Sequence, residues 1–129
     1  MATWTRFEDI EAWKKARILS AQVHFLTAEG DCSRDYAFVR QIRDAARSVM
    51  SNIAEGFERD GSKEFCNFVS VAKGSAGEVR SQLYSGLDVG YFTQADFDKL
   101  YALVTEVSRM LAGLIQYLRT TDVRGHKFG

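Results

Sequence analysis

Proline is absent from the 129-residue chain. Because proline interrupts helices more strongly than any other residue, helices here must end through glycine and capping chemistry instead. Gly30, Gly61 and Gly90 each follow a segment of helical periodicity, where glycine forms a left-handed C-terminal cap at the least steric cost. Ser62 and Thr93 stand at the expected starts of the next helices, where their hydroxyl groups can accept hydrogen bonds from free backbone amides. The sequence therefore predicts long and unbroken helices.

Long apolar runs, cysteine and histidine are also scarce. No run approaches the roughly 20 apolar residues of a membrane span, and the N-terminus lacks the basic-then-apolar layout of a signal peptide. Cys32 and Cys66 lack metal-ligand spacing, and two isolated thiols favour a reduced cytosolic protein. His24 and His126 do not complete the Glu-x-x-His pairs of a di-iron bundle. We expect a soluble, cytoplasmic protein with no membrane segment, no metal and no cofactor.

The sequence contains no complete catalytic motif. The phosphate-binding pattern Gly-x4-Gly-Lys is missing. Ser70 and Lys73 match the spacing Ser-x-x-Lys, but the companion motifs of penicillin-recognising enzymes are absent. Gly74 and Gly77 lack the first glycine of a nucleophile elbow, and we interpret them as small residues that let another helix approach closely. The sequence therefore predicts a protein that is not an enzyme.

The chain lacks net charge, because 17 Lys and Arg residues balance 17 Asp and Glu residues. A neutral protein has no general field that attracts phosphate groups. Arg40, Arg43 and Arg47 nevertheless fall in one narrow sector of a predicted helix, and Arg34 lies just before it. This row is either a solvated face with Asp44 as a partner or a phosphate-contacting strip that a ring of subunits would repeat. We take the four arginines as the candidate contacts for RNA or DNA.

Apolar residues recur at helical spacing in four segments, at about residues 7–28, 35–59, 62–89 and 97–118. In the last segment, steps of three and four alternate without interruption, as in a packed bundle seam. The seam residues are Phe97, Leu100, Val104, Val107, Leu111, Leu114 and Leu118. Short connections between long helices predict an all-α, antiparallel up-down-up-down four-helix bundle. We expect one domain over residues 1–129, with loose ends at about 1–6 and 120–129.

A second apolar line accompanies the seam of the last helix. Leu103, Met110 and Tyr117 are spaced seven residues apart. A monomer would leave this line exposed to water, and contiguous exposed apolar surface usually marks a contact. We therefore expect a homo-oligomer with these residues at its interface.

A polar cluster closes the second predicted helix. It consists of Ser51, Asn52 and Glu55, and it is followed by Gly56, which we expect to stop the helix. One interpretation is a half-buried hydrogen-bond network that fixes helix register or subunit packing. The other interpretation is a site for a ligand or a partner.

Several short motifs carry a family resemblance. They are Gln41-Ile42-Arg43, Ser51-Asn52-Ile53-Ala54-Glu55-Gly56, Ser62-Lys63-Glu64-Phe65, Gly74-Ser75 and Leu87-Asp88-Val89-Gly90-Tyr91. Together the motifs resemble the four-helix-bundle proteins encoded in intervening sequences of 23S ribosomal RNA genes, a family that includes accessory proteins of diversity-generating retroelements. The similarity extends from Trp13 to Leu118. It implies an antiparallel bundle that assembles into a homopentamer and, for the retroelement members, binding of nucleic acid and of a reverse transcriptase.

Two functional hypotheses follow from these observations. The first is a non-enzymatic oligomeric scaffold that holds a protein partner. The alternative is an accessory protein of the retroelement type that binds RNA or DNA.

Overall fold

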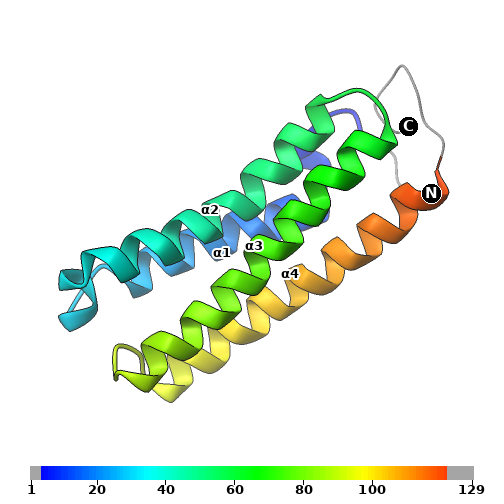
Figure 1. The fold of residues 1–129 in the computed structure, drawn as a ribbon. Helices are drawn as coiled ribbons and strands as arrows, with labels where there is room; N and C mark the ends of the chain where they lie inside the picture. The colour runs from blue at the N-terminus through cyan, green and yellow to red at the C-terminus, as the bar shows by residue number, and fades with distance from the viewer. Residues whose placement is uncertain (1–3, 122–129) are drawn as a thin grey trace.

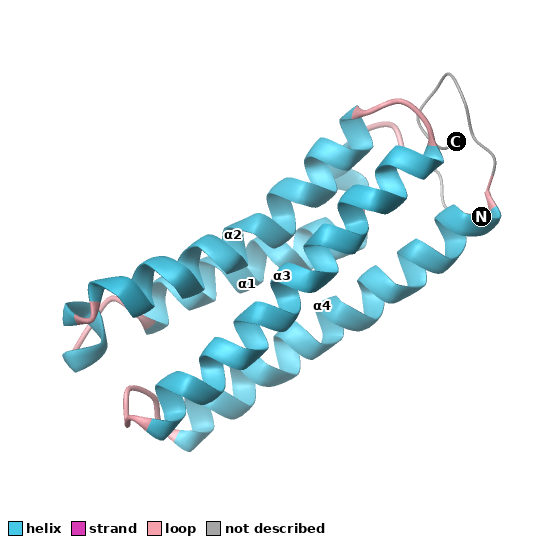
Figure 2. Cartoon of the chain, in the orientation of Figure 1, coloured by secondary structure: helices cyan, strands magenta, loops and turns pink. Residues whose placement is uncertain are grey.

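The computed structural model describes residues 4–121, which form four long α-helices and no strand (Figures 1 and 2). The α-helices are α1 (Glu11–Leu26), α2 (Tyr36–Glu58), α3 (Ser62–Asp88) and α4 (Gln94–Thr120). Short 3-10 helices precede α1 (η1, Phe7–Asp9) and α2 (η2, Asp31–Arg34). The prediction of four helices is confirmed, whereas most of the predicted loose C-terminal end lies outside the described residues.

Local chemistry sets the helix ends. Asp35 caps α2 by accepting a hydrogen bond from the Phe38 amide at 3.2 Å. The Thr93 hydroxyl caps α4 by accepting from the Asp96 amide at 3.1 Å, as the sequence predicted. The predicted cap at Ser62 is wrong. Residue 61 is the N-cap of α3, and the Ser62 hydroxyl instead donates to the Thr121 carbonyl at 2.8 Å.

Gly90 ends α3 in the left-handed region, with φ of 81°. The Tyr91 amide donates to the Gly86 carbonyl at 2.8 Å, and the Gly90 amide donates to the Leu87 carbonyl at 3.0 Å. These two bonds make the Schellman arrangement, which satisfies carbonyls that the end of a helix would leave free. The positive φ expected at this glycine is confirmed.

Each helix packs against two others: α2 against α1 and α3, and α4 against α3 and α1. The predicted seam of α4 is buried throughout, with exposures between 0% and 8%. In α2, Phe38 is buried, whereas Val39 is only partly buried. The reason is tertiary. The rings of Tyr91 and Phe92, from the segment between α3 and α4, lie 5.4 Å and 6.0 Å from the Phe38 ring.

Two glycines allow close packing, and they are not the expected ones. Gly56 does not stop α2, which continues to Glu58. It is buried, and a Cβ atom there would lie 2.6 Å from the Phe68 Cβ. Gly86 is likewise packed under the Phe92 ring. Gly74 and Gly77 have no atom of a neighbouring element within 4 Å of a Cβ position, so no helix of this chain approaches them closely.

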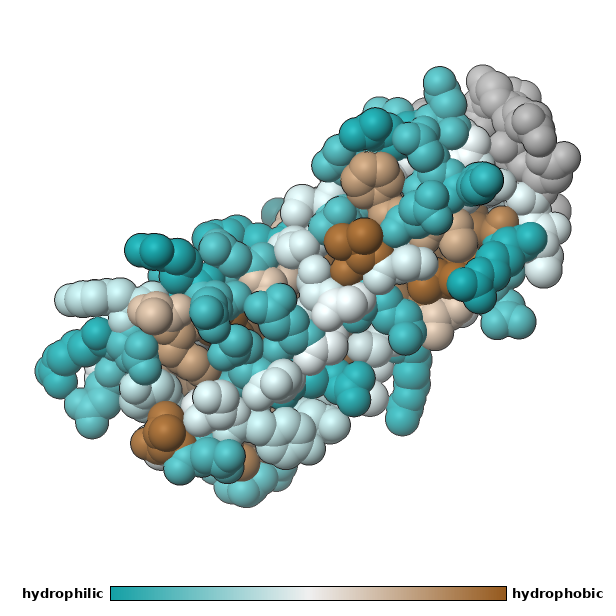
Figure 3. Space-filling model, viewed as in Figure 1, coloured by the Kyte–Doolittle hydropathy of each residue, from teal (hydrophilic) through white to brown (hydrophobic). Residues whose placement is uncertain are grey.

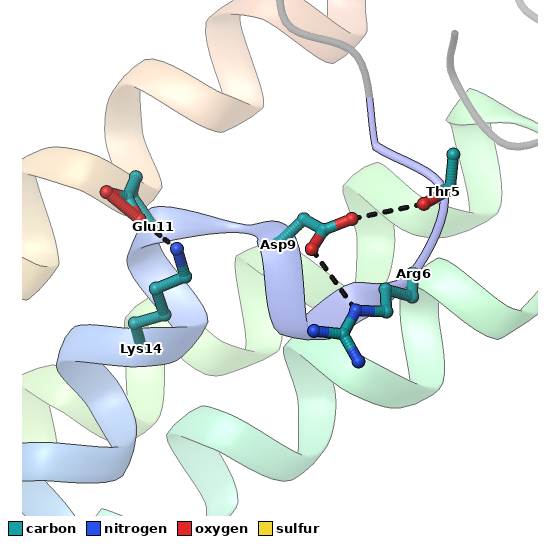
Figure 4. A network of polar contacts seen from close by, with 5 residues as sticks. All are labelled: Thr5, Arg6, Asp9, Glu11 and Lys14. Carbon is teal, nitrogen blue, oxygen red and sulfur yellow. Dashed lines mark hydrogen bonds and ion pairs between the residues drawn. The ribbon is translucent and has the colours of Figure 1, made fainter.

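The segment before α1 packs on the bundle. The Trp4 ring lies 5.9 Å from the Tyr117 ring and 6.3 Å from the Phe65 ring, both edge to face. Asp9 accepts hydrogen bonds from the Thr5 hydroxyl and the Arg6 guanidinium, each at 3.2 Å (Figure 4). Residues 4–6, which have no apolar periodicity, are therefore placed by contacts with the rest of the fold.

Candidate functional site

The predicted polar cluster of α2 divides into two groups, of which the first faces α3. Asn52 is half-buried, and its amide nitrogen donates to the Ser48 carbonyl at 2.8 Å and to the Ser48 hydroxyl at 2.9 Å. The Ser48 hydroxyl shares a further hydrogen bond of 2.8 Å with the Ser75 hydroxyl of α3. This half-buried network links two helices, and the Asn52 side-chain amide donates its hydrogen bonds to groups of the same chain. Sequence reasoning missed Ser48 and Ser75, because nothing in their spacing shows that they face each other.

The second group is exposed. The Ser51 hydroxyl donates to a main-chain carbonyl one turn earlier at 2.8 Å. Glu55 accepts from Arg59 at 2.7 Å, and the Arg59 guanidinium lies 5.0 Å from the centroid of the Phe68 ring. This group fastens the end of α2 to the start of α3. Gly56 lies on the buried side of the helix.

Arg43 is bound to the end of α1. Its Nε donates to the Thr27 hydroxyl at 2.9 Å, and its Nη2 donates to the His24 carbonyl at 3.2 Å. Thr27 is fully buried, and its hydroxyl donates to the Val23 carbonyl at 2.8 Å. Free carbonyls at the C-terminal end of a helix favour a cation, so Arg43 both caps α1 and holds α2 against it.

The other candidate arginines are exposed. Arg34 pairs with Asp31 at 3.0 Å, and Arg47 pairs with Asp44 at 2.7 Å. Arg40 is exposed and makes no ion pair or hydrogen bond with any residue between 4 and 121. Exposed ion pairs of this kind contribute little to stability, and their charged groups exchange readily to other partners. The row that the sequence suggested therefore consists of one structural arginine and three solvent-facing ones.

Tyr91 and Asp35 join the segment between α3 and α4 to the start of α2. The Tyr91 hydroxyl donates to Asp35 Oδ2 at 2.6 Å. This bond is the main reason that the pKa of Asp35 is lowered, with the Phe38 amide adding to the effect. The same bond raises the pKa of Tyr91 to about 12. The pair is a structural clasp at one end of the bundle.

The second apolar line of α4 lies on the side of α1. Leu103, Met110 and Tyr117 are partly buried against the core, so the chain itself covers part of the surface that the sequence suggested would be wet. Met110 and Tyr117 line a groove of about 440 Å³ together with Trp4 and Ile10. The Tyr117 hydroxyl is buried there and has no hydrogen-bond partner among the described residues.

The rim of this groove carries little free charge. Glu11 lines it, and this carboxylate pairs with Lys14 at 3.0 Å (Figure 4). We call this surface the α1–α4 groove. Elsewhere, on the side shown in Figure 3, apolar side chains appear as separate patches among hydrophilic ones. The α1–α4 groove is therefore a mainly apolar opening whose one carboxylate is already paired.

Within the described residues, no group of His, Cys, Asp or Glu side chains is arranged to hold a metal ion. The helices of this part of the chain also lack any stretch long and apolar enough to cross a membrane. Burial raises the pKa of the Cys32 thiol, which lies in the core, so this cysteine is not placed as a nucleophile.

Comparison with known proteins agrees with the fold. The model of one family, described as 23S rRNA-intervening sequence protein, matches residues 8–113. The chain belongs to this family. None of the curated proteins matches the sequence.

A solved structure also resembles the fold of this chain. It is a protein of unknown function from the S23 ribosomal protein family of Bacteroides thetaiotaomicron. The sequences are 18% identical, the TM-score is 0.75, and the match covers 81% of this chain and 98% of the other. At this level of identity the likeness establishes a shared fold.

Proposed function

We propose that the protein is a non-enzymatic interaction module that assembles into a homo-oligomer and holds a protein partner. The observation that carries the proposal is the α1–α4 groove, in which Trp4, Met110 and Tyr117 form partly exposed apolar surface. Apolar surface of this kind marks contact sites, because covering it removes it from water. A second copy that covers the groove would bury Met110 fully. The family resemblance supports a pentamer as the closed form.

The arrangement of the helices is part of the same proposal. Early residues of one helix meet late residues of the next, as Gln41 of α2 meets Gln82 of α3 at 2.9 Å. Contacts of this kind support the antiparallel up-down-up-down order. In such a bundle α1 and α4 form one outer seam, and a ring of subunits would use that seam as its repeated contact.

Light scattering coupled to gel filtration tests the assembly. The wild-type protein should be an oligomer at micromolar concentration, and Met110→Glu should shift it toward the monomer because the interface would bury an unpaired carboxylate. Ala102→Glu is the matched control, since Ala102 is exposed on the same helix and lies outside the α1–α4 groove. Circular dichroism establishes that both variants fold. A monomeric wild-type protein, or equal masses for both variants and wild type, would contradict the proposal.

Nucleic-acid binding is the second candidate function. The observation that favours it is the exposed Arg40, which has no partner among the described residues. Arg43 follows it by about one helical turn and Arg47 by about two. The ion pair of Arg47 with Asp44 is exposed and can exchange for phosphate. A ring would repeat such contacts, and avidity would offset the neutral net charge. Arg43 contributes less to this face because its guanidinium group binds the end of α1.

Fluorescence anisotropy with single- and double-stranded RNA and DNA tests this second function. If it is correct, affinity falls steeply between about 50 and 200 mM salt, and each neutralised phosphate contributes about −0.9 to the log–log slope on duplex DNA. Arg40→Glu combined with Arg47→Glu should abolish binding, whereas Arg17→Glu combined with Lys99→Glu, at exposed residues outside the α1–α4 groove, should retain it. Absence of binding by the wild-type protein at low salt would leave the scaffold function alone.

A further inference from the structure

A second groove runs along the seam between α3 and α4. One half has a volume of about 470 Å³ and the other about 370 Å³. Ser70 and Arg119 line both halves, so the halves form one surface, which we call the α3–α4 groove. Gly74, Ala112 and Ile115 supply small and apolar parts of its lining. None of these residues lines the α1–α4 groove, so the two surfaces are separate.

The charges of the α3–α4 groove have one sign. Lys63, Lys73 and Arg119 line it and are exposed. Within residues 4–121, none of these three cations takes part in an ion pair, and no Asp or Glu lines either half. Exposed Arg34 and Arg47, in contrast, are each paired with a carboxylate, Arg34 with Asp31 and Arg47 with Asp44. The groove is therefore a local basic surface on a chain whose net charge is +0.

The spacing of the cations fits a helix. Lys63 and Lys73 are ten residues apart on α3, which corresponds to about 15 Å along the axis. Arg119 of α4 lines one half of the groove with Lys73 and the other half with Lys63. A partner helix that lies along the seam has the same rise, so carboxylates about three turns apart on it would meet the two lysines. Gly74 leaves space for that helix, since nothing lies within 4 Å of its Cβ position.

We propose that the α3–α4 groove binds an acidic amphipathic helix of a partner protein. Such a helix uses both features of the surface: its apolar face covers Ala112 and Ile115, and its carboxylates pair with the three cations. A polynucleotide would use the cations and leave the apolar lining without a partner. Three cations on a neutral chain also give little long-range attraction for a phosphate backbone. Charge and lining together favour carboxylates on a helix over phosphates on a strand.

This inference rests on the proposed scaffold function in one respect, namely that the module holds a protein partner. The probe is a fluorescein-labelled peptide of about five helical turns, with leucine and alanine on one face and glutamates about ten residues apart beside it. A peptide with glutamine in place of every glutamate is the charge control. A single-stranded DNA with the same number of charges is the polynucleotide probe. Fluorescence anisotropy measures the binding of all three to the full chain.

The expected result is binding of the acidic peptide in preference to both other probes. Lys73→Glu combined with Arg119→Glu should weaken it by about tenfold or more, since two attractive contacts become repulsive. Arg17→Glu combined with Lys99→Glu makes the same change of net charge on exposed residues outside both grooves and should leave affinity unchanged. Light scattering should give the same mass for both variants as for the wild type.

Gly74→Leu separates groove binding from general attraction. It keeps every charge, and the Cβ atom that it adds has no other atom within 4 Å. We expect it to weaken the acidic peptide by about tenfold while thermal stability is maintained or raised, because leucine favours the helix more than glycine does. Unchanged affinity in Gly74→Leu would overturn the groove as the site. Preference for DNA, no binding of the acidic peptide, or a changed oligomeric mass in Lys73→Glu/Arg119→Glu would overturn the acidic helix as its occupant. Failure of the Met110→Glu experiment would leave this result untouched.

Discussion

A methyl group added at Gly56 should destabilise the bundle, although alanine favours helices more than glycine does. Its Cβ would lie 2.6 Å from the Phe68 Cβ and 3.0 Å from the Phe65 Cδ1. Carbon atoms pack at about 3.5–4.0 Å, and the backbone fixes the Phe68 Cβ, so α2 and α3 must separate by roughly 1 Å. Overpacking of this kind costs about 1–3 kcal/mol. Removing glycine from a helix interior stabilises by about 0.5–1 kcal/mol.

Gly74→Ala provides the internal reference for this prediction. It makes the same chemical change in α3, at a position with nothing within 4 Å of the Cβ. Only the helix preference acts there, so Gly74→Ala should stabilise by about 0.5–1 kcal/mol. The difference between the two variants isolates the overpacking term, and we expect Gly56→Ala to be less stable than Gly74→Ala by about 1–3 kcal/mol.

Urea unfolding followed by far-ultraviolet circular dichroism measures both free energies. The slopes with urea concentration must agree between the variants, because a changed slope means a changed amount of surface exposed on unfolding. Several protein concentrations are needed, since association adds a concentration-dependent term to the free energy of unfolding. If Gly56→Ala proved as stable as Gly74→Ala, the close approach of α2 and α3 at Gly56 would be wrong.

Three further predictions concern the core, the end of α1 and the clasp. Leu111→Ala, in a fully buried part of the α4 seam, should cost about 2–5 kcal/mol in urea unfolding, and a negligible loss would contradict the seam. Arg43→Ala should lower the free energy of unfolding by about 1–3 kcal/mol because it removes charged donors from the end of α1. Arg40→Ala should stay within about 0.5 kcal/mol of wild type, and equal effects of the two variants would refute the structural role of Arg43. The lowered pKa of Asp35 stabilises the folded state at pH values above the ordinary pKa of 3.8, and this effect is lost as the pH falls below that value. The raised pKa of Tyr91 stabilises the folded state at pH values below the ordinary pKa of 10.0, and this effect is lost as the pH rises toward about 12. Tyr91→Phe should therefore be less stable than wild type at neutral pH and approach it at both extremes; a pH-independent difference in unfolding midpoint would contradict the clasp.

The sequence by itself determined the helical elements. Steps of three and four between apolar residues identified the α4 seam, and every member of it is buried. Glycine and capping chemistry placed the ends, as at Gly90, where φ is positive, and at Thr93, whose hydroxyl caps α4. These features could be predicted because periodicity and caps involve residues within one or two turns of each other. The short motifs also indicated the family, which the match over residues 8–113 establishes.

Only the tertiary structure decided what individual residues within those helices do. Gly56 and Gly74 are both helical glycines, yet the first lies under Phe68 and the second faces open space. Arg40 and Arg43 share one sector of α2, yet Arg43 binds the end of α1 and Arg40 has no partner among the described residues. In each case the deciding atoms belong to another helix, distant in the sequence. Spacing along one helix fixes which face a residue occupies, but the neighbour that meets this face depends on how the helices pack together.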